Sequence, residues 1–150
     1  NDPAAFLQSD TWLRASRESR ELQMEDRLMG NALQSLLRDL AVDSAARFAH
    51  CTLSFAAAFA IAARHWSIPS NQALAGLMWI AAEGQVSAAM RLVPLGQTSG
   101  QRILLKATEV IERSVRRASQ LGDAEIGNTA FGLSIASAWH EEQYSRLFRS

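Results

Sequence analysis

Apolar side chains recur along most of this chain at the three-to-four-residue spacing of helices that face a core. Few segments alternate with a period of two, and β-branched residues are sparse, whereas Ala, Leu, Arg, Glu and Gln dominate. We therefore predict an all-α fold. One compact helical domain should cover residues 1–150 and contain about five to seven helices.

Five helical segments are predicted between the breaks in this pattern. They cover residues 12–40, about 43–66, 70–92, 103–121, and a last segment that holds residues 133–139. Polar residues that can cap a helix precede most of them: Ser9 or Asp10, Asp43 or Ser44, Ser70 after Pro69, and Asn128 or Thr129. Small residues at 56–63 mark the second segment as a central helix, because they let a neighbouring helix approach closely.

Residues 91–102 form a corner between two long helices. Pro94 stops the incoming helix, and Gly96 and Gly100 permit a tight backbone. The stretch superficially resembles a phosphate-binding loop. It has three residues between its glycines instead of four, and Gln101 and Arg102 follow instead of Lys and Ser or Thr. We therefore exclude nucleotide binding by this loop.

Charge and composition narrow the class of partner. The 15 basic and 15 acidic side chains balance, so nothing favours nucleic acid or an anionic membrane surface as the main partner. The longest uncharged apolar run, residues 51–63, is shorter than the ~20 residues that cross a bilayer. Cys51 is the single cysteine, which fits a reducing cytoplasm. Glu83 and Gly84 interrupt an apolar helix. Glu83 should lie at its exposed edge or be buried with a partner. Gly84 indicates close packing against another backbone or a subunit contact.

In a helix, residues 14–21 would place charged side chains on nearly every face. In a continuous helix, Arg14 and Glu18, and likewise Arg17 and Glu21, would meet at i,i+4 spacing. This pattern is typical of a solvated helix surface, where exposed ion pairs contribute little. The alternative is a polar interface in which Arg17 and Glu21 contact a partner.

Candidate chemistry is sparse. His140-Glu141 begins like a zinc-protease helix, but Tyr144 stands where the second histidine is required. We predict no catalytic residue, no metal site and no cofactor. An alternative remains open: a helical enzyme or cofactor-binding bundle whose site combines Glu83, His50 and His140. That alternative requires the three side chains to share one pocket.

Three motifs together resemble the UreF family of urease accessory proteins. In chain order they are Ser16–Glu21 with Glu25–Arg27 behind it, Leu92–Gln97 with Gly100-Gln101, and Ile135–Ala138 with His140-Glu141 and Gln143–Ser150. We call them the N-terminal, central and C-terminal motifs. Trp139 stands where the family pattern has Arg. The family's N-terminal region has no counterpart here, so we expect a fragment that lacks it.

The resemblance implies an all-helical, non-catalytic protein that forms homodimers in the cytoplasm. Members of the family join a second accessory protein, UreD (also called UreH), and the GTPase UreG. The assembly delivers nickel to apo-urease. A UreF-like protein would bridge the other two accessory proteins and regulate the GTPase.

The C-terminal residues are the strongest candidates for partner binding. Residues 143–150 have too few apolar side chains to build structure of their own, and such segments are often ordered by a partner. Tyr144, Leu147 and Phe148 would serve as anchors, and Arg146 as a planar fork for a carboxylate or carbonyl groups. Apolar helix surface should also drive self-association as an isologous dimer.

Overall fold

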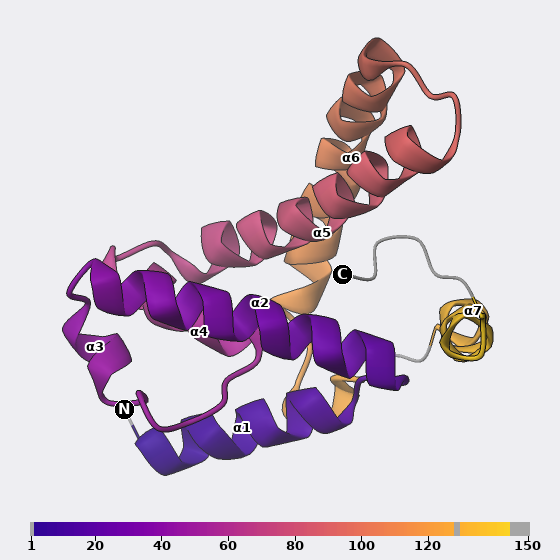
Figure 1. Ribbon diagram of the computed structural model, residues 1–150. Helices are drawn as coiled ribbons and strands as arrows, with labels where there is room; N and C mark the ends of the chain where they lie inside the picture. Colours follow the sequence, from indigo (N-terminus) through magenta and orange to yellow (C-terminus); the bar gives the residue numbers. More distant parts are fainter. Residues whose placement is uncertain (1, 128–129, 145–150) are drawn as a thin grey trace. The chain divides into compact units, whose positions relative to one another are not determined.

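A computed structural model of the chain describes residues 2–127 and 130–144, and all helices in these ranges are shown in Figure 1. The seven α-helices are α1 (Pro3–Ala15), α2 (Arg20–Asp39), α3 (Asp43–Ala46), α4 (Phe55–His65), α5 (Ser70–Leu92), α6 (Gln97–Ala118) and α7 (Phe131–Glu141). A short 3-10 turn covers Asp123–Glu125. No strand occurs in the described ranges, which confirms the all-α prediction.

Contacts within the chain form two compact units. Unit 1 comprises Asn1–Ala62 and Gly127–Ser150, and unit 2 comprises Ala63–Ile126. Within the described residues, unit 1 therefore contains α1, α2, α3, α7 and most of α4. Its apolar core contains these buried residues: Leu37, Val42, Ala45, Leu53, Ala57, Ile61 and Ala62.

The predicted helix over residues 12–40 is wrong, because a turn at residues 16–19 divides it into α1 and α2. The Asp2 side chain caps α1 by accepting from the Ala4 amide at 2.9 Å. The Ser19 side chain caps α2 by accepting from the Leu22 amide at 3.2 Å. Serine at this position satisfies an amide that the new helix would otherwise leave without a partner. The charged residues 14–21 thus include the start of α2, which the pattern of their side chains did not indicate.

The predicted helix over residues 43–66 is also wrong, because turns between α3 and α4 interrupt it. Gln34 of α2 holds these turns. Its side-chain amide donates to the carbonyls of Phe48 and Cys51 at 3.3 and 3.2 Å, and its carbonyl accepts from the Leu53 amide at 3.4 Å. These bonds replace helical ones. The α4 helix then begins after Ser54.

Gly30 allows α2 to lie directly against the backbone that enters α4. A Cβ atom at this position would be 2.2 Å from the Leu53 carbonyl oxygen and 2.9 Å from the Ser54 carbonyl carbon. Real Cβ contacts are not this short. Only glycine permits this approach, so Gly30 fixes where α2 meets the residue 53–55 segment.

Unit 2 is a hairpin of two long helices, α5 and α6, that run side by side (Figure 1). The predicted break at Pro69 and the end at Leu92 are confirmed, and a corner follows at residues 93–96. Gly100, which was predicted to permit a tight backbone in this corner, is instead buried inside α6. The second helix begins at Gln97, earlier than the predicted Ile103. Among the described residues, the buried apolar side chains of unit 2 are fewer than those of unit 1: Ala63, Val86, Leu104 and Val115.

Gly84 and Glu83 of α5 lie at an exposed edge. A Cβ atom on Gly84 would meet nothing within 4 Å, so the predicted close packing does not occur in the described residues. Glu83 is exposed and accepts a hydrogen bond from the Ser87 hydroxyl at 2.7 Å. Among the residues that the structure describes, no helix has the length and apolar character needed to span a membrane.

Candidate functional site

Residues of the N-terminal and C-terminal motifs bond to each other in unit 1. The Ser19 and Ser137 hydroxyls lie 2.6 Å apart, and His140 Nδ1 lies 2.6 Å from Glu21 Oε2. The Glu21 amide donates to Glu141 Oε1 at 3.1 Å. We call these five residues the α2–α7 joint. Segments more than a hundred positions apart in the sequence therefore form one structural element.

Two further contacts extend the α2–α7 joint along α7. The Ala130 amide donates to Glu18 Oε1 at 3.2 Å, and Arg20 Nε lies 3.8 Å from Glu141 Oε2. The Glu141 carboxylate thus lies at the N-terminus of α2, where a helix favours negative charge. Ser19 is buried, whereas 31% of the Glu21 side chain and 40% of the His140 side chain remain accessible. The joint orients α7 relative to the start of α2.

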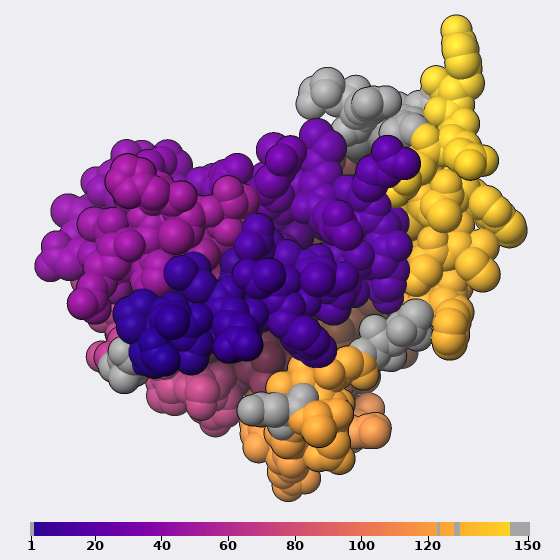
Figure 2. All heavy atoms as spheres, turned by 90° about the horizontal axis from the view of Figure 1, so that it is seen from below, coloured from indigo at the N-terminus to yellow at the C-terminus, as the bar shows by residue number. Residues whose placement is uncertain are grey.

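The remaining face of α7 is apolar and exposed. Phe131, Ile135 and Trp139 follow one another at i,i+4 spacing and are 74%, 50% and 71% exposed. We call these three residues the outer face of α7. Figure 2 shows the atoms of α7 in yellow, standing beside α2 with much of their surface open. An exposed, contiguous apolar surface of this kind is a candidate protein interaction site.

The predicted partner-binding residues have different positions. Arg17 Nη2 lies 3.3 Å from Asp26 Oδ1, and Glu21 contacts His140, so both make contacts inside unit 1. The two i,i+4 pairs predicted from a continuous helix, Arg14 with Glu18 and Arg17 with Glu21, are wrong. Tyr144 is fully exposed. Arg146, Leu147 and Phe148, like the predicted caps Asn128 and Thr129, lie outside the described residues.

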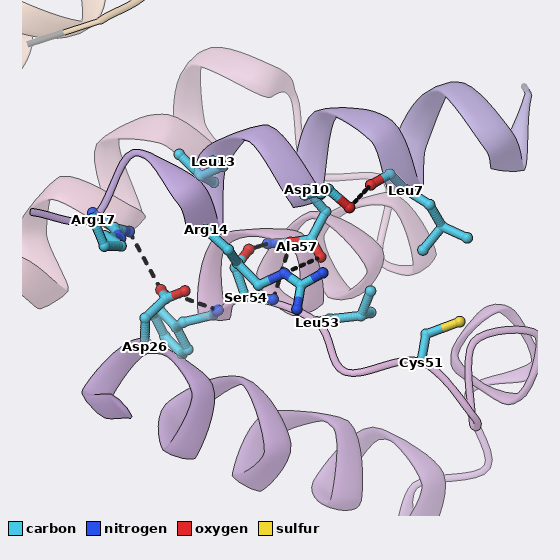
Figure 3. A network of polar contacts seen from close by, with 12 residues as sticks. Leu7, Asp10, Leu13, Arg14, Arg17, Asp26, Cys51, Leu53, Ser54 and Ala57 are labelled. Atoms are coloured by element: carbon cyan, nitrogen blue, oxygen red, sulfur yellow. Dashed lines mark hydrogen bonds and ion pairs between the residues drawn. The ribbon is translucent and has the colours of Figure 1, made fainter. Parts of the chain in front are cut away.

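Two buried aspartates bind the backbone at the start of α4, a role that the sequence did not reveal. Asp10 Oδ1 accepts from the Ser54 amide at 3.0 Å, and Asp26 Oδ1 accepts from the Phe55 amide at 3.3 Å (Figure 3). The Ser54 hydroxyl accepts from the Ala57 amide at 3.0 Å. The N-terminus of α4 is thus capped by its own serine and by carboxylates from α1 and α2.

Each of these aspartates also pairs with an arginine. Asp10 Oδ2 lies 3.1 Å from Arg14 Nε, and Asp26 contacts Arg17. Asp10 was predicted as a cap for its own helix. That prediction is wrong, because Asp10 lies inside α1, and only the folded chain places it against residues 44 positions away. Rules based on the spacing of neighbouring residues therefore cannot predict the contact between Asp10 and Ser54.

Within residues 2–127 and 130–144, no arrangement of side chains favours the alternative enzyme site. His140 is bonded to Glu21, and His50 is exposed beside a cavity of about 220 Å³ that Cys51 and Arg38 also line. Glu83 belongs to unit 2 and is exposed. Among the described residues, no three His, Cys, Asp or Glu side chains are arranged to hold a metal ion.

Comparison with known proteins points to one family. The UreF family model matches residues 1–108. The chain is 56% identical to urease accessory protein UreF 2 of Brucella anthropi and 44% identical to urease accessory protein UreF of Alkalilimnicola ehrlichii. Both alignments cover 100% of this chain and 66% of the relative. The UreF of Hahella chejuensis is 39% identical over 100% of this chain.

These relatives are named as accessory proteins and not as enzymes, in agreement with the non-catalytic prediction. The chain spans slightly less than two thirds of the length of the first two, 66% in each case. The family match covers the N-terminal and central motifs, and the alignments extend over the C-terminal motif as well. The chain belongs to the UreF family of urease accessory proteins.

Proposed function

We propose that this chain is a non-catalytic scaffold for the metallation of urease. It bridges a UreD/UreH-like accessory protein and a UreG-like GTPase while nickel is delivered to apo-urease, and it regulates the GTPase. Membership of the UreF family supports the accessory role.

One observation carries the proposal: the exposed outer face of α7, held in place by the α2–α7 joint. Phe131, Ile135 and Trp139 present aromatic and aliphatic side chains of the kind that dominate binding energy at protein interfaces. The joint fixes α7 before a partner arrives, which lowers the entropy lost on binding. We assign this face, together with Tyr144, Arg146, Leu147 and Phe148, to the UreD/UreH-like partner.

Self-association in the cytoplasm forms part of the same proposal. Unit 2 exposes large apolar side chains, including Leu105 at 68% and Val110 at 52%, and isologous dimers commonly cover such surfaces. Light scattering at tens of micromolar should give the mass of a dimer. A monomer mass under these conditions would contradict this part of the proposal.

Co-purification tests the bridging role. The tagged chain should capture a UreD/UreH-like protein, and with it the UreG-like GTPase. Removal of residues 144–150, or Arg146→Ala alone, should abolish capture, because the anchors and the planar guanidinium are lost. Circular dichroism should show unchanged helical content and an almost unchanged thermal midpoint.

Arg113→Ala on α6 is the matched control, since it removes an exposed arginine from unit 2. It should leave capture intact. Capture at wild-type yield by the truncated chain would exclude the C-terminal residues as the binding element. Loss of cooperative unfolding in that variant would instead place these residues in the core.

A further inference from the structure

A cavity of about 560 Å³ opens between α1 and α2 in unit 1. Its lining is Thr11, Arg14 and Ala15 on α1, and Arg20, Gln23, Met24, Asp26 and Arg27 on α2. These positions recur mostly three to four residues apart, so one face of each helix lines the cavity. Its volume falls in the range of ligand pockets, about 300–1,000 Å³. Arg20 also contacts Glu141 of the α2–α7 joint, whereas the other lining residues belong neither to the joint nor to the outer face of α7.

The lining carries more basic than acidic side chains, although two of its arginines have partners: Arg14 pairs with Asp10, and Arg20, whose side chain is 92% exposed, lies 3.8 Å from Glu141. It contains three arginines and one acidic residue, Asp26, whose carboxylate already accepts from Arg17 and from the Phe55 amide (Figure 3). Asp10 Oδ2 lies 3.1 Å from Arg14 Nε. Arg27 is exposed and has no ion pair with any residue that the structure describes. Guanidinium groups in such a setting favour a carboxylate ligand.

The spacing along α2 indicates the form of this ligand. Arg20 and Arg27 lie two turns apart on one helix face, a rise of about 10 Å, and Met24 lies between them. Met24 is 55% exposed and offers a deformable apolar contact. In an extended peptide, residues i, i+2 and i+4 share one face, and the outer two are about 13 Å apart. The flexible side chains of the two arginines, and of acidic residues in such a peptide, absorb the difference of about 3 Å.

We propose that the cavity between α1 and α2 docks an acidic segment of a partner protein. The segment carries two carboxylates on one face with an apolar side chain between them. Its carboxylates pair with Arg20 and Arg27, and its apolar side chain packs on Met24. Charge complementarity selects this occupant over a neutral or basic segment. The proposal goes beyond the scaffold role, since it concerns a second surface and needs no urease protein for its test.

A synthetic peptide tests the proposal directly. The probe is acetyl-Glu-Ser-Leu-Ser-Glu-amide, titrated into the ¹⁵N-labelled chain at millimolar concentration and followed by NMR. Amide shifts should concentrate at residues 11–15 and 20–27, and higher salt should weaken binding. Arg27→Gln should weaken binding by about tenfold, because it removes a charge-assisted hydrogen bond. Met24→Ala should weaken it less.

Three controls make the result decisive. The neutral analogue acetyl-Gln-Ser-Leu-Ser-Gln-amide should bind at least tenfold more weakly. Arg113→Gln, which removes an exposed arginine from α6, should leave binding unchanged. Inorganic phosphate should compete only weakly, since it makes no contact with Met24. Equal binding of both peptides, no effect of Arg27→Gln, or displacement by phosphate at equal concentration would each overturn the proposal.

Discussion

The two units of the chain are built by different means. In unit 1, buried polar side chains connect distant segments: Gln34 holds the turns before α4, and Asp10 and Asp26 cap its N-terminus. In unit 2, the two helices α5 and α6 follow each other in the chain, and apolar side chains such as Leu104 and Val115 are buried. The fold of unit 1 therefore depends on specific hydrogen bonds between distant residues, whereas the fold of unit 2 depends on apolar side chains that recur at helical spacing.

This difference predicts unequal sensitivity to the smallest change, the addition of one methyl group to a glycine. Gly30→Ala in unit 1 should lower the free energy of unfolding by about 3 kcal/mol. The new Cβ would be 2.2 Å from the Leu53 carbonyl oxygen, and backbone atoms cannot rotate away. Denaturant unfolding followed by circular dichroism measures the effect.

Gly84→Ala in unit 2 is the matched control. Its Cβ meets nothing within 4 Å, and alanine is the better helix former by about 1 kcal/mol. This variant should be as stable as the wild type or slightly more stable. Equal stability of Gly30→Ala and the wild type would show that α2 does not contact the backbone at residues 53–55.

A second prediction concerns the buried carboxylate of Asp10, whose side chain is 1% exposed. Asp10→Ala should lower the free energy of unfolding by about 2 kcal/mol, because the Ser54 amide and Arg14 both lose a partner. Asp10→Asn should recover part of this loss by keeping an acceptor for the amide. Asp39→Ala, an exposed change on α2, should stay within about 0.5 kcal/mol. An Asp10→Ala variant as stable as Asp39→Ala would contradict the capping role.

A third and smaller effect is expected at Gly100 in unit 2. A Cβ atom there would be 2.5 Å from Met90 Sδ, the far end of a flexible side chain. Met90 can adopt another rotamer, and alanine improves helix propensity, so Gly100→Ala should lower stability by at most about 1 kcal/mol. A loss as large as that of Gly30→Ala would remove the contrast between the two units.

The same contrast explains how much of the fold was predictable. The α5 helix and the corner at Pro94 followed from hydrophobic spacing and breaker residues, because the signals are local. The two interrupted helices were missed in unit 1. Their breaks depend on Ser19, which caps a helix in a segment that reads as continuous, and on Gln34, whose partners are 14 to 19 positions away.

The candidate site was predictable only in part. The motifs identified the family, and His140 and Glu21 both lie in them. Their contact with each other could not be read from the sequence, since 119 positions separate the two residues. The outer face of α7 was missed as well. The spacing of Phe131, Ile135 and Trp139 does show that they share one helix face. It does not show whether that face is exposed or lies in the core, which only the burial in the structure decides.

Capture of the UreD/UreH-like partner by a variant of α7 tests the central claim most directly. The double variant Phe131→Ser, Trp139→Ser removes the aromatic part of the outer face and leaves the α2–α7 joint intact. Trp66→Ser is the matched control, since Trp66 is 51% exposed and belongs to unit 2. We predict that the double variant keeps its helical content and loses capture, while Trp66→Ser captures normally. Capture at wild-type yield by the double variant would contradict the assignment of α7 as the partner-binding helix.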